Sequence, residues 1–322
     1  MPIEGPASFL PCSAEFSAHW NLVNTALAPA VLVLPAGTTR ANLETHHSSL
    51  VTLHSGVQNS INEVETARGD LDDRKLALHT RLNQFNDKGR SYLGGTTLAR
   101  ALPKVPGLTE GQGAFLPALD DMESLWTRAN ALAPTAGFTP PLLLLGGYTL
   151  VAFSADLVLL RAAFKTMTTR EVELRVKRGE REDLEGVIYP ILKSYREAMP
   201  TFFAATHALV MTLPRLTPEP GSTPDAVVAT GVWNGATTQA KITWTASTAT
   251  DLERFEVRWS PGSVYSSEDE TVLGSVLPDA AREFFTAQGL GAPGAVGVFR
   301  VYVVTGTGNE KGSNTVKVTR PV

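Results

Sequence analysis

The residue types in this chain that could do chemistry gather on two segments with the pattern of long helices. Four histidines share the first segment: His46, His47, His54 and His79. His47 and His54 are separated by a full heptad, whereas two metal ligands on one helix need a spacing of three or four residues. Acidic clusters at 70–73 and 180–183 lack the spacing of a calcium-binding loop. The pattern therefore predicts no metal site. The histidines are expected at polar positions on the edge of the helix seam, and the acidic clusters on solvated helix faces.

The motifs of the common enzyme classes are missing from the sequence. It holds no phosphate-binding loop, dinucleotide fingerprint or Gly-x-Ser-x-Gly elbow. Cys12 is the only cysteine and has no histidine context, so neither a disulfide within the chain nor a cysteine-based metal site can form. We therefore expect no catalytic residue, no metal and no cofactor.

Arg68-Gly69-Asp70 spells a tripeptide that integrins recognise in some of their ligands. Arg178-Gly179-Glu180 stands at the matching place in the second long segment, so what the two segments share is Arg-Gly-acid. Both tripeptides fall inside predicted helices, where a glycine costs about 1 kcal/mol relative to alanine. The reuse of this glycine predicts that Gly69 and Gly179 mark a close approach between helices, or a bend, and does not favour an adhesion motif.

The two long segments are copies of each other. Val31–Thr39 opens the first and Pro141–Thr149 opens the second, and the predicted helices run over 40–92 and 149–199. Large apolar residues recur at heptad spacing in both copies: Leu43, Leu50, Val57, Val64, Leu71, Leu78 and Phe85, then Phe153, Leu160, Met167, Leu174, Ile188 and Tyr195. A heptad repeat of this length predicts a coiled-coil-like seam between paired helices. Arg181 breaks the second seam where the first has Leu71.

The doubling extends to the short segments before each long helix. Helices are predicted over 16–27 and 116–132, and each contains a tryptophan, Trp20 and Trp126. Residues 1–15 have the pattern of an irregular arm, Pro190 is expected to kink the second long helix, and 201–213 is predicted to be a further helix. Residues 1–214 are therefore expected to form an elongated helical bundle with an internal duplication over about 16–92 and 118–199. The relative direction of the two long helices stays open.

The composition and the hydrophobic pattern of the sequence change after Pro214. Residues 215–223 are rich in proline and are expected to be a linker, and from 224 to 322 apolar and polar residues alternate over short runs typical of strands. Three of these runs, Lys241–Trp244, Phe255–Trp259 and Phe299–Val304, resemble strands B, C and F of fibronectin type III domains. One departure is that the usual tyrosine of the strand F corner falls near Gly297.

The resemblance implies an immunoglobulin-like β-sandwich, so the fold class is multidomain α plus β. The implied sandwich core consists of Trp244, Phe255, Val257, Phe299 and Val301. The whole layout is similar to a group of bacterial proteins with a helical N-terminal half and a C-terminal type III module. This similarity implies an architecture and no mechanism.

Composition limits the partners. The chain has 322 residues and a formal net charge of -4, with its basic residues scattered, so we expect no nucleic-acid partner. The apolar run over 141–164 is interrupted by Gly146-Gly147 and Asp156, which predicts no membrane span. The N-terminus lacks a signal-peptide pattern, which favours the cytoplasm, whereas the type III resemblance favours the cell surface.

These features favour a structural or interaction protein that is not an enzyme. The expected function is a self-associating subunit of a filament, tube or sheet, so the expected partner is a homo-oligomer or polymer, with other proteins as further partners. The alternative is an adhesin or glycan-binding protein with a helical stalk, in which Trp233 or Trp259 contacts the ligand. An enzyme with an unfamiliar site is the third alternative.

Overall fold

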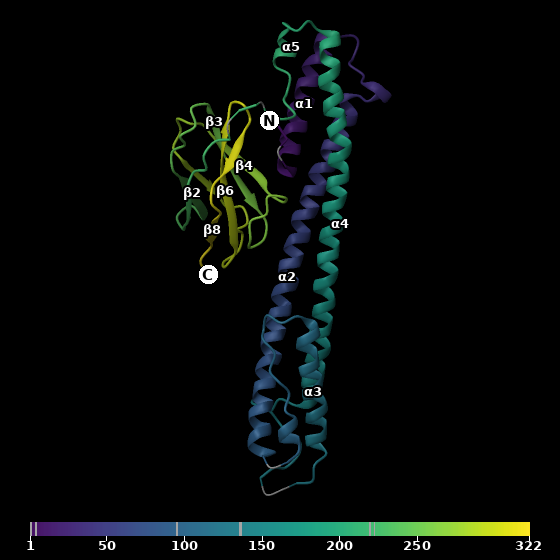
Figure 1. Ribbon diagram of the computed structural model, residues 1–322, viewed down its shortest axis with the longest axis vertical. Helices are drawn as coiled ribbons and strands as arrows, with labels where there is room; N and C mark the ends of the chain where they lie inside the picture. Colours follow the sequence, from purple (N-terminus) through teal and green to yellow (C-terminus); the bar gives the residue numbers. More distant parts are fainter. Residues whose placement is uncertain (1, 4, 95, 135–136, 219, 222) are drawn as a thin grey trace. The chain divides into compact units, whose positions relative to one another are not determined.

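A computed structural model describes residues 2–3, 5–94, 96–134, 137–218, 220–221 and 223–322 (Figure 1). The N-terminal part is helical and the C-terminal part is an antiparallel β-domain. The helices are α1 (Pro6–Leu27), α2 (Arg40–Tyr92), α3 (Gln112–Asn130), α4 (Leu150–Phe202) and α5 (Ala208–Met211), with 3-10 turns η1 (Pro35–Gly37) and η2 (Leu98–Ala101). The chain forms two compact units, unit 1 (Met1–Asn62 with Leu174–Val322) and unit 2 (Glu63–Glu173), and α2 and α4 contribute to both.

The helical core of unit 1 joins α1, the start of α2 and the end of α4. Leu43 and Leu50, near the start of α2, share a buried cluster with Ile188 and Tyr195, near the end of α4. The two long helices are therefore antiparallel here. Trp20 of α1 completes the cluster, with its ring centroid 4.8 Å from that of Tyr195.

Unit 2 repeats this arrangement with the other halves of the long helices. Phe85, near the end of α2, and Phe153, near the start of α4, both pack against Trp126 of α3, with ring centroids at 5.6 and 5.8 Å. The helices are again antiparallel. The segment between α2 and α3 lies along α2, because Asn86 Nδ2 donates to the carbonyl oxygen of Pro103 at 2.9 Å.

Two local expectations differ from the structure. The N-terminal arm is mostly helical, because α1 begins at Pro6, a residue that suits the first turn of a helix, and continues through Pro11. Within 201–213 the helical residues are the four of α5 and the last two of α4. Pro190 lies inside the continuous helix α4, and a kink at this residue stays a prediction.

The β-domain consists of two antiparallel sheets within the described part of the chain. Its strands are β1 (Ala229–Asn234), β2 (Gln239–Trp244), β3 (Leu252–Ser260), β4 (Thr271–Val276), β5 (Glu283–Thr286), β6 (Val296–Thr305), β7 (Glu310–Gly312) and β8 (Val316–Thr319). One sheet has the order β1–β2–β5, and the other has the order β4–β3–β6–β7, with β8 also paired to β6. Both sheets contribute to one hydrophobic core.

The strands begin at Ala229 and the last helix ends at Met211, so the transition between the two parts lies within 212–228. Residues 219 and 222 of the predicted linker lie outside the described residues. Among the helices that the structure describes, none combines the length and the apolar character that crossing a bilayer requires.

Candidate functional site

The most concentrated polar chemistry in the described residues lies on one face of the larger sheet. Strand β3 alternates, so Phe255, Val257 and Trp259 enter the core while Glu256 and Arg258 lie on the opposite face. Both charged residues are nonetheless almost fully buried, with 1% and 3% of their surface exposed. Antiparallel pairing brings Tyr302 of β6 beside Glu256, and Glu310 of β7 beside Val304 of β6.

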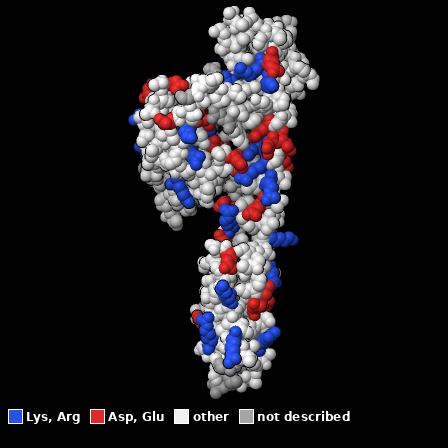
Figure 2. All heavy atoms as spheres, viewed as in Figure 1, with Lys and Arg blue, Asp and Glu red and all other residues white. Residues whose placement is uncertain are grey.

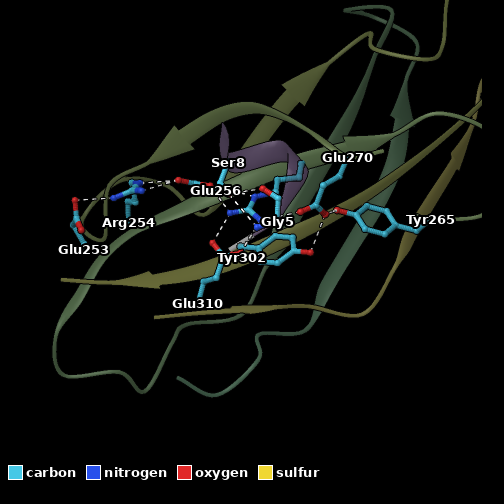
Figure 3. A network of polar contacts seen from close by, with 10 residues as sticks. Gly5, Ser8, Glu253, Arg254, Glu256, Tyr265, Glu270, Tyr302 and Glu310 are labelled. Carbon is cyan, nitrogen blue, oxygen red and sulfur yellow. Dashed lines mark hydrogen bonds and ion pairs between the residues drawn. The ribbon is translucent and has the colours of Figure 1, made fainter. Parts of the chain in front are cut away.

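Arg258 bonds to all three carboxylates of this cluster. Figure 3 labels these carboxylates, Glu256, Glu270 and Glu310. Arg258 Nη1 donates to Glu270 Oε1 at 2.9 Å and to Glu310 Oε1 at 2.7 Å. Its Nη2 donates to Glu256 Oε2 at 2.8 Å and also to Glu310, and its Nε donates to Glu256 at 3.2 Å. The guanidinium carbon lies 3.9 Å from the centroid of the Tyr302 ring. Every guanidinium nitrogen therefore has a carboxylate partner.

Two tyrosines complete the cluster. Tyr302 donates its hydroxyl to Glu270 Oε2 at 2.9 Å, and Tyr265 donates to the same oxygen. Burial and the adjacent Glu270 charge raise the pKa of both phenols. Burial alone would lower the pKa of Arg258, but its hydrogen bonds and charge contacts with Glu310, Glu256 and Glu270 outweigh burial and raise it. These groups therefore hold their protonation states at ordinary pH.

A cavity of about 210 Å³ lies between this cluster and the start of α1. Gly5–Ser8 line one side, and Glu270, Tyr302 and Glu310 line the other. The positive end of a helix dipole is favourable beside carboxylates. The carboxylates on this side of the cavity are already hydrogen-bonded, Glu310 to Arg258 and Glu270 to Arg258 and the two tyrosines.

A second polar cluster joins the helices of unit 1 to the β-domain. Asp269, whose side chain is 1% exposed, accepts from Arg178 Nε at 3.2 Å and Nη2 at 2.5 Å, and Arg181 Nη1 lies 3.5 Å away. Glu185 Oε1 lies 3.6 Å from Arg181 Nε and 4.0 Å from His54 Nε2. We call these five residues the joint cluster.

The joint cluster contains two titratable groups with shifted pKa values. Burial raises the pKa of Glu185 to about 7, although the Arg181 charge opposes this shift. Burial and the Arg181 charge lower the pKa of His54 to about 4. Three buried atoms in the cluster, His54 Nε2, Arg181 Nε and Glu185 Oε1, have no hydrogen-bond partner among the described residues. The joint cluster is therefore held together by charge pairing, and its hydrogen bonding is incomplete.

Most predicted seam residues lie inside the two helical cores. Met167 and Leu174 are half-buried, and the others are buried: Leu43, Leu50, Val57, Val64, Leu71, Leu78, Phe85, Phe153, Leu160, Ile188 and Tyr195. The predicted sandwich-core residues are all buried in the β-domain: Trp244, Phe255, Val257, Phe299 and Val301.

Two predicted roles are wrong. Gly69 and Gly179 do not mark a close approach, because a Cβ at either position would meet no described atom within 4 Å. A tight approach in α2 occurs instead at Gly89, where an added Cβ would lie 2.6 Å from Leu102 Cδ2. Trp259 cannot contact a glycan as folded, because it is buried in the core and packs on Gly289.

Trp233 is half-buried, and the guanidinium carbon of Arg320 lies 5.5 Å from its ring centroid. Among the residues that the structure describes, no group of three His, Cys, Asp or Glu side chains is placed to hold a metal ion. Sequence reasoning missed the cluster around Arg258, although Glu256 and Arg258 stand at alternate positions of a predicted strand. Charged residues at such positions are the usual signal of a solvated face, so nothing local predicted their burial.

No protein-family model matches the sequence, and no curated protein matches it. Among solved structures, an Fn3-like protein from Clostridium thermocellum is similar over 31% of this chain and 97% of its own, with 18% identity and a TM-score of 0.25. Pectate lyase Pel3 from Pectobacterium carotovorum is similar over 29% of this chain and 27% of its own, with 17% identity and a TM-score of 0.24. Pectate lyase PelI from Erwinia chrysanthemi, solved with tetragalacturonic acid, gives 29% and 28% coverage, 16% identity and a TM-score of 0.25. The chain thus spans little more than a quarter of each lyase, and likenesses this weak carry no functional argument.

Proposed function

We propose that this chain is a structural subunit, not an enzyme, and that it associates with further copies of itself. The observation that carries the proposal is an exposed apolar face on α4 in unit 2, which we call the α4 apolar face. It consists of Val151, Ala155, Val158, Leu159 and Ala162. Val151 is 80% exposed and Val158 is 61% exposed. Contiguous exposed apolar side chains are typical of protein–protein contacts.

The internal duplication supplies a control for this face. The matching positions of α2 in the first copy are Ala41, Thr45, Ser48, Ser49 and Thr52. There the hydroxyls donate to main-chain carbonyls one turn back, as Ser48 Oγ does to Glu44 O at 2.9 Å. The same helix position therefore tolerates polar residues, so the fold alone does not require apolar residues on α4. A partner surface explains the difference, and the duplicated scaffold points to a second copy as that partner.

The buried polar clusters also support a structural function. The charges of the Arg258 cluster pair with one another inside the β-domain. Those of the joint cluster join α4 to Asp269 of the β-domain and bring His54 of α2 beside Glu185 of α4 within unit 1. Breaking a buried ion pair by removing one partner is strongly destabilising, because the other charge is left buried. These charges therefore stabilise the attachment of the β-domain.

The finer architecture belongs to the same proposal. We propose that the β-domain is an immunoglobulin-like β-sandwich of the fibronectin type III kind. Its strand orders, β1–β2–β5 and β4–β3–β6–β7, and its shared core support this proposal. The heptad spacing of the buried residues supports a coiled-coil-like seam between α2 and α4.

The test is sedimentation velocity over a range of concentrations, followed by negative-stain microscopy. We expect the wild-type chain to form larger species as its concentration rises. The double substitution Val158→Ser/Leu159→Ser copies the residues of α2 and should raise the concentration needed for association by about tenfold or more. The control is Val232→Ser on β1, which is 62% exposed and should leave association unchanged. A wild-type chain that stays monomeric at every concentration would refute the proposal.

A further inference from the structure

Unit 2 carries a group of cations with no described partner. Arg100, Lys104 and Arg128 are exposed, and no ion pair or side-chain hydrogen bond joins them to a described residue. We call these three residues the basic end. Figure 2 shows Lys and Arg predominating over Asp and Glu on the visible face where α2 and α3 finish.

Contacts with α2 place the three cations at similar positions along the axis of α2 in unit 2. Leu102, between Arg100 and Lys104, packs beside Gly89. The residue before Lys104 is Pro103, whose carbonyl accepts from Asn86. Trp126, one half-turn before Arg128, packs on Phe85. All three cations therefore lie around the last turns of α2, although they come from three different segments.

The same unit carries a complementary surface further back along α2. Asp72 and Asp73 are exposed and have no described ion-pair partner, in contrast to Asp70, which pairs with Arg74 at 2.9 Å. Beside them the large apolar residues Leu76 and Leu108 are 52% and 41% exposed. We call these four residues the acidic stretch. At 1.5 Å per residue, Asp73 lies about 28 Å along α2 from its last residue, so one side chain cannot bridge the two surfaces.

We propose that the basic end of one copy docks on the acidic stretch of a second copy. This inference rests on the proposed self-association and names a contact that gives it a direction. The two surfaces differ, so the contact is heterologous, and a heterologous contact that does not close produces an open chain of copies. Charge complementarity across such a contact sets partner orientation and the rate of association.

A cation near the end of a helix also stabilises the negative end of the helix dipole, as Arg128 does in the last turn of α3. That effect operates within one chain and predicts a change in melting temperature when the charge is reversed. It predicts no change in association and no recovery when two variants are mixed. The test therefore measures melting and association separately.

The test uses charge reversal in the full chain. The first variant is Arg100→Glu/Lys104→Glu/Arg128→Glu, and the second is Asp72→Lys/Asp73→Lys. We expect each variant alone to need at least about a tenfold higher concentration to associate than the wild type, at low salt and with a helical circular dichroism spectrum retained. An equimolar mixture of the two should associate again, because each supplies the charge that the other lacks. Wild-type association should weaken as salt rises.

The control variant is Arg282→Glu/Lys311→Glu/Lys317→Glu, which reverses three exposed cations of the β-domain and should associate like the wild type. If the wild type associates and the first variant associates equally well, the contact is wrong although the proposed function stands. If both variants lose association and their mixture does not recover it, the contact is also wrong. A wild type that never associates overturns both proposals.

Discussion

The first and second helical copies can be compared residue by residue, because the same contacts close each of them. Asn24 Oδ1 accepts from the Leu32 amide at 2.9 Å, and Asn130 Oδ1 accepts from the Leu142 amide at 2.7 Å. The loop that follows is closed by Leu34 donating to Thr38 in the first copy and by Leu144 donating to Tyr148 in the second. Both copies therefore use one design for the turn between a short helix and a long helix.

The copies differ where their long helices meet different neighbours. Leu71 of α2 lies in the core of unit 2, whereas its counterpart Arg181 of α4 reaches Asp269 in unit 1. One turn further on, Lys75 donates to the carbonyl oxygens of Leu108 and Glu110, while its counterpart Glu185 belongs to the joint cluster. The copies therefore diverge where α4 also contacts the β-domain in unit 1. Contact with the β-domain, and not the pairing of α2 with α4, accounts for Arg181 and Glu185 in the second copy.

The largest expected difference between the copies concerns their tryptophans. Both Trp20 and Trp126 are fully buried, so replacing either by alanine should cost about 3–5 kcal/mol of stability. Trp126 Nε1 also donates to the Leu142 carbonyl at 2.9 Å, whereas Trp20 Nε1 has no partner among the described residues. Trp126→Phe should therefore cost about 1 kcal/mol more than Trp20→Phe, because it leaves a buried carbonyl unpaired. Urea unfolding of the four variants measures these differences, and equal losses for the two phenylalanine variants would contradict the role of the hydrogen bond.

The next difference is in the pH dependence of unit 1, whose joint cluster takes His54 from the first copy and Glu185 from the second. Glu185 has a pKa raised from 4.5 to about 7, so the stability that it contributes is lost as pH rises through that range. His54 has a pKa lowered from 6.5 to about 4, so its contribution is lost as pH falls through that range. The two slopes oppose each other between pH 4.5 and 6.5, and the wild type should be nearly flat there.

Glu185→Gln should reveal the His54 slope, with stability falling by about 3 kcal/mol from pH 6.5 to pH 4 relative to the wild-type trend. His54→Asn should reveal the Glu185 slope, in which stability falls as pH rises. Denaturant midpoints measured across this range check both profiles. Asp183→Asn, at an exposed neighbouring position, is the control and should leave the wild-type profile unchanged. Parallel profiles for wild type and Glu185→Gln would show that the joint cluster does not titrate in this way.

The smallest effect concerns the glycine that both copies keep. Because a Cβ at Gly69 or Gly179 meets open space, alanine at either position should stabilise its helix by roughly 0.5–1 kcal/mol. Gly89→Ala should gain less, since Leu102 must move to admit the new methyl group. Thermal melting of the three variants measures the order, and a loss of stability at Gly69 or Gly179 would restore the close-approach interpretation.

Spacing predicted the helical elements well where one face of a helix must be apolar. The structure begins and ends α2 at the residues that the sequence indicates, and Trp20 and Trp126 are buried in matching short helices. The prediction of an irregular arm failed because α1 begins already at Pro6, where a proline is tolerated in the first turn, and continues through Pro11. The prediction for Trp259 failed because alternation along a strand does not tell which face will be covered.

The candidate site was beyond the reach of local patterns for the same physical reason. Glu256 and Arg258 are typical of a solvated strand face, whereas the partners that surround Arg258, among them Glu270 and Glu310, come from other segments of the chain. The periodicities can be read from the residues alone, and they predict the doubled helices, the strand-rich C-terminal part and the break at Arg181. The antiparallel direction of α2 and α4, the burial of the charged clusters and the partner of Arg181 became apparent in the folded chain. Those outcomes depend on contacts between residues distant in the chain, and no periodicity within one segment records such contacts.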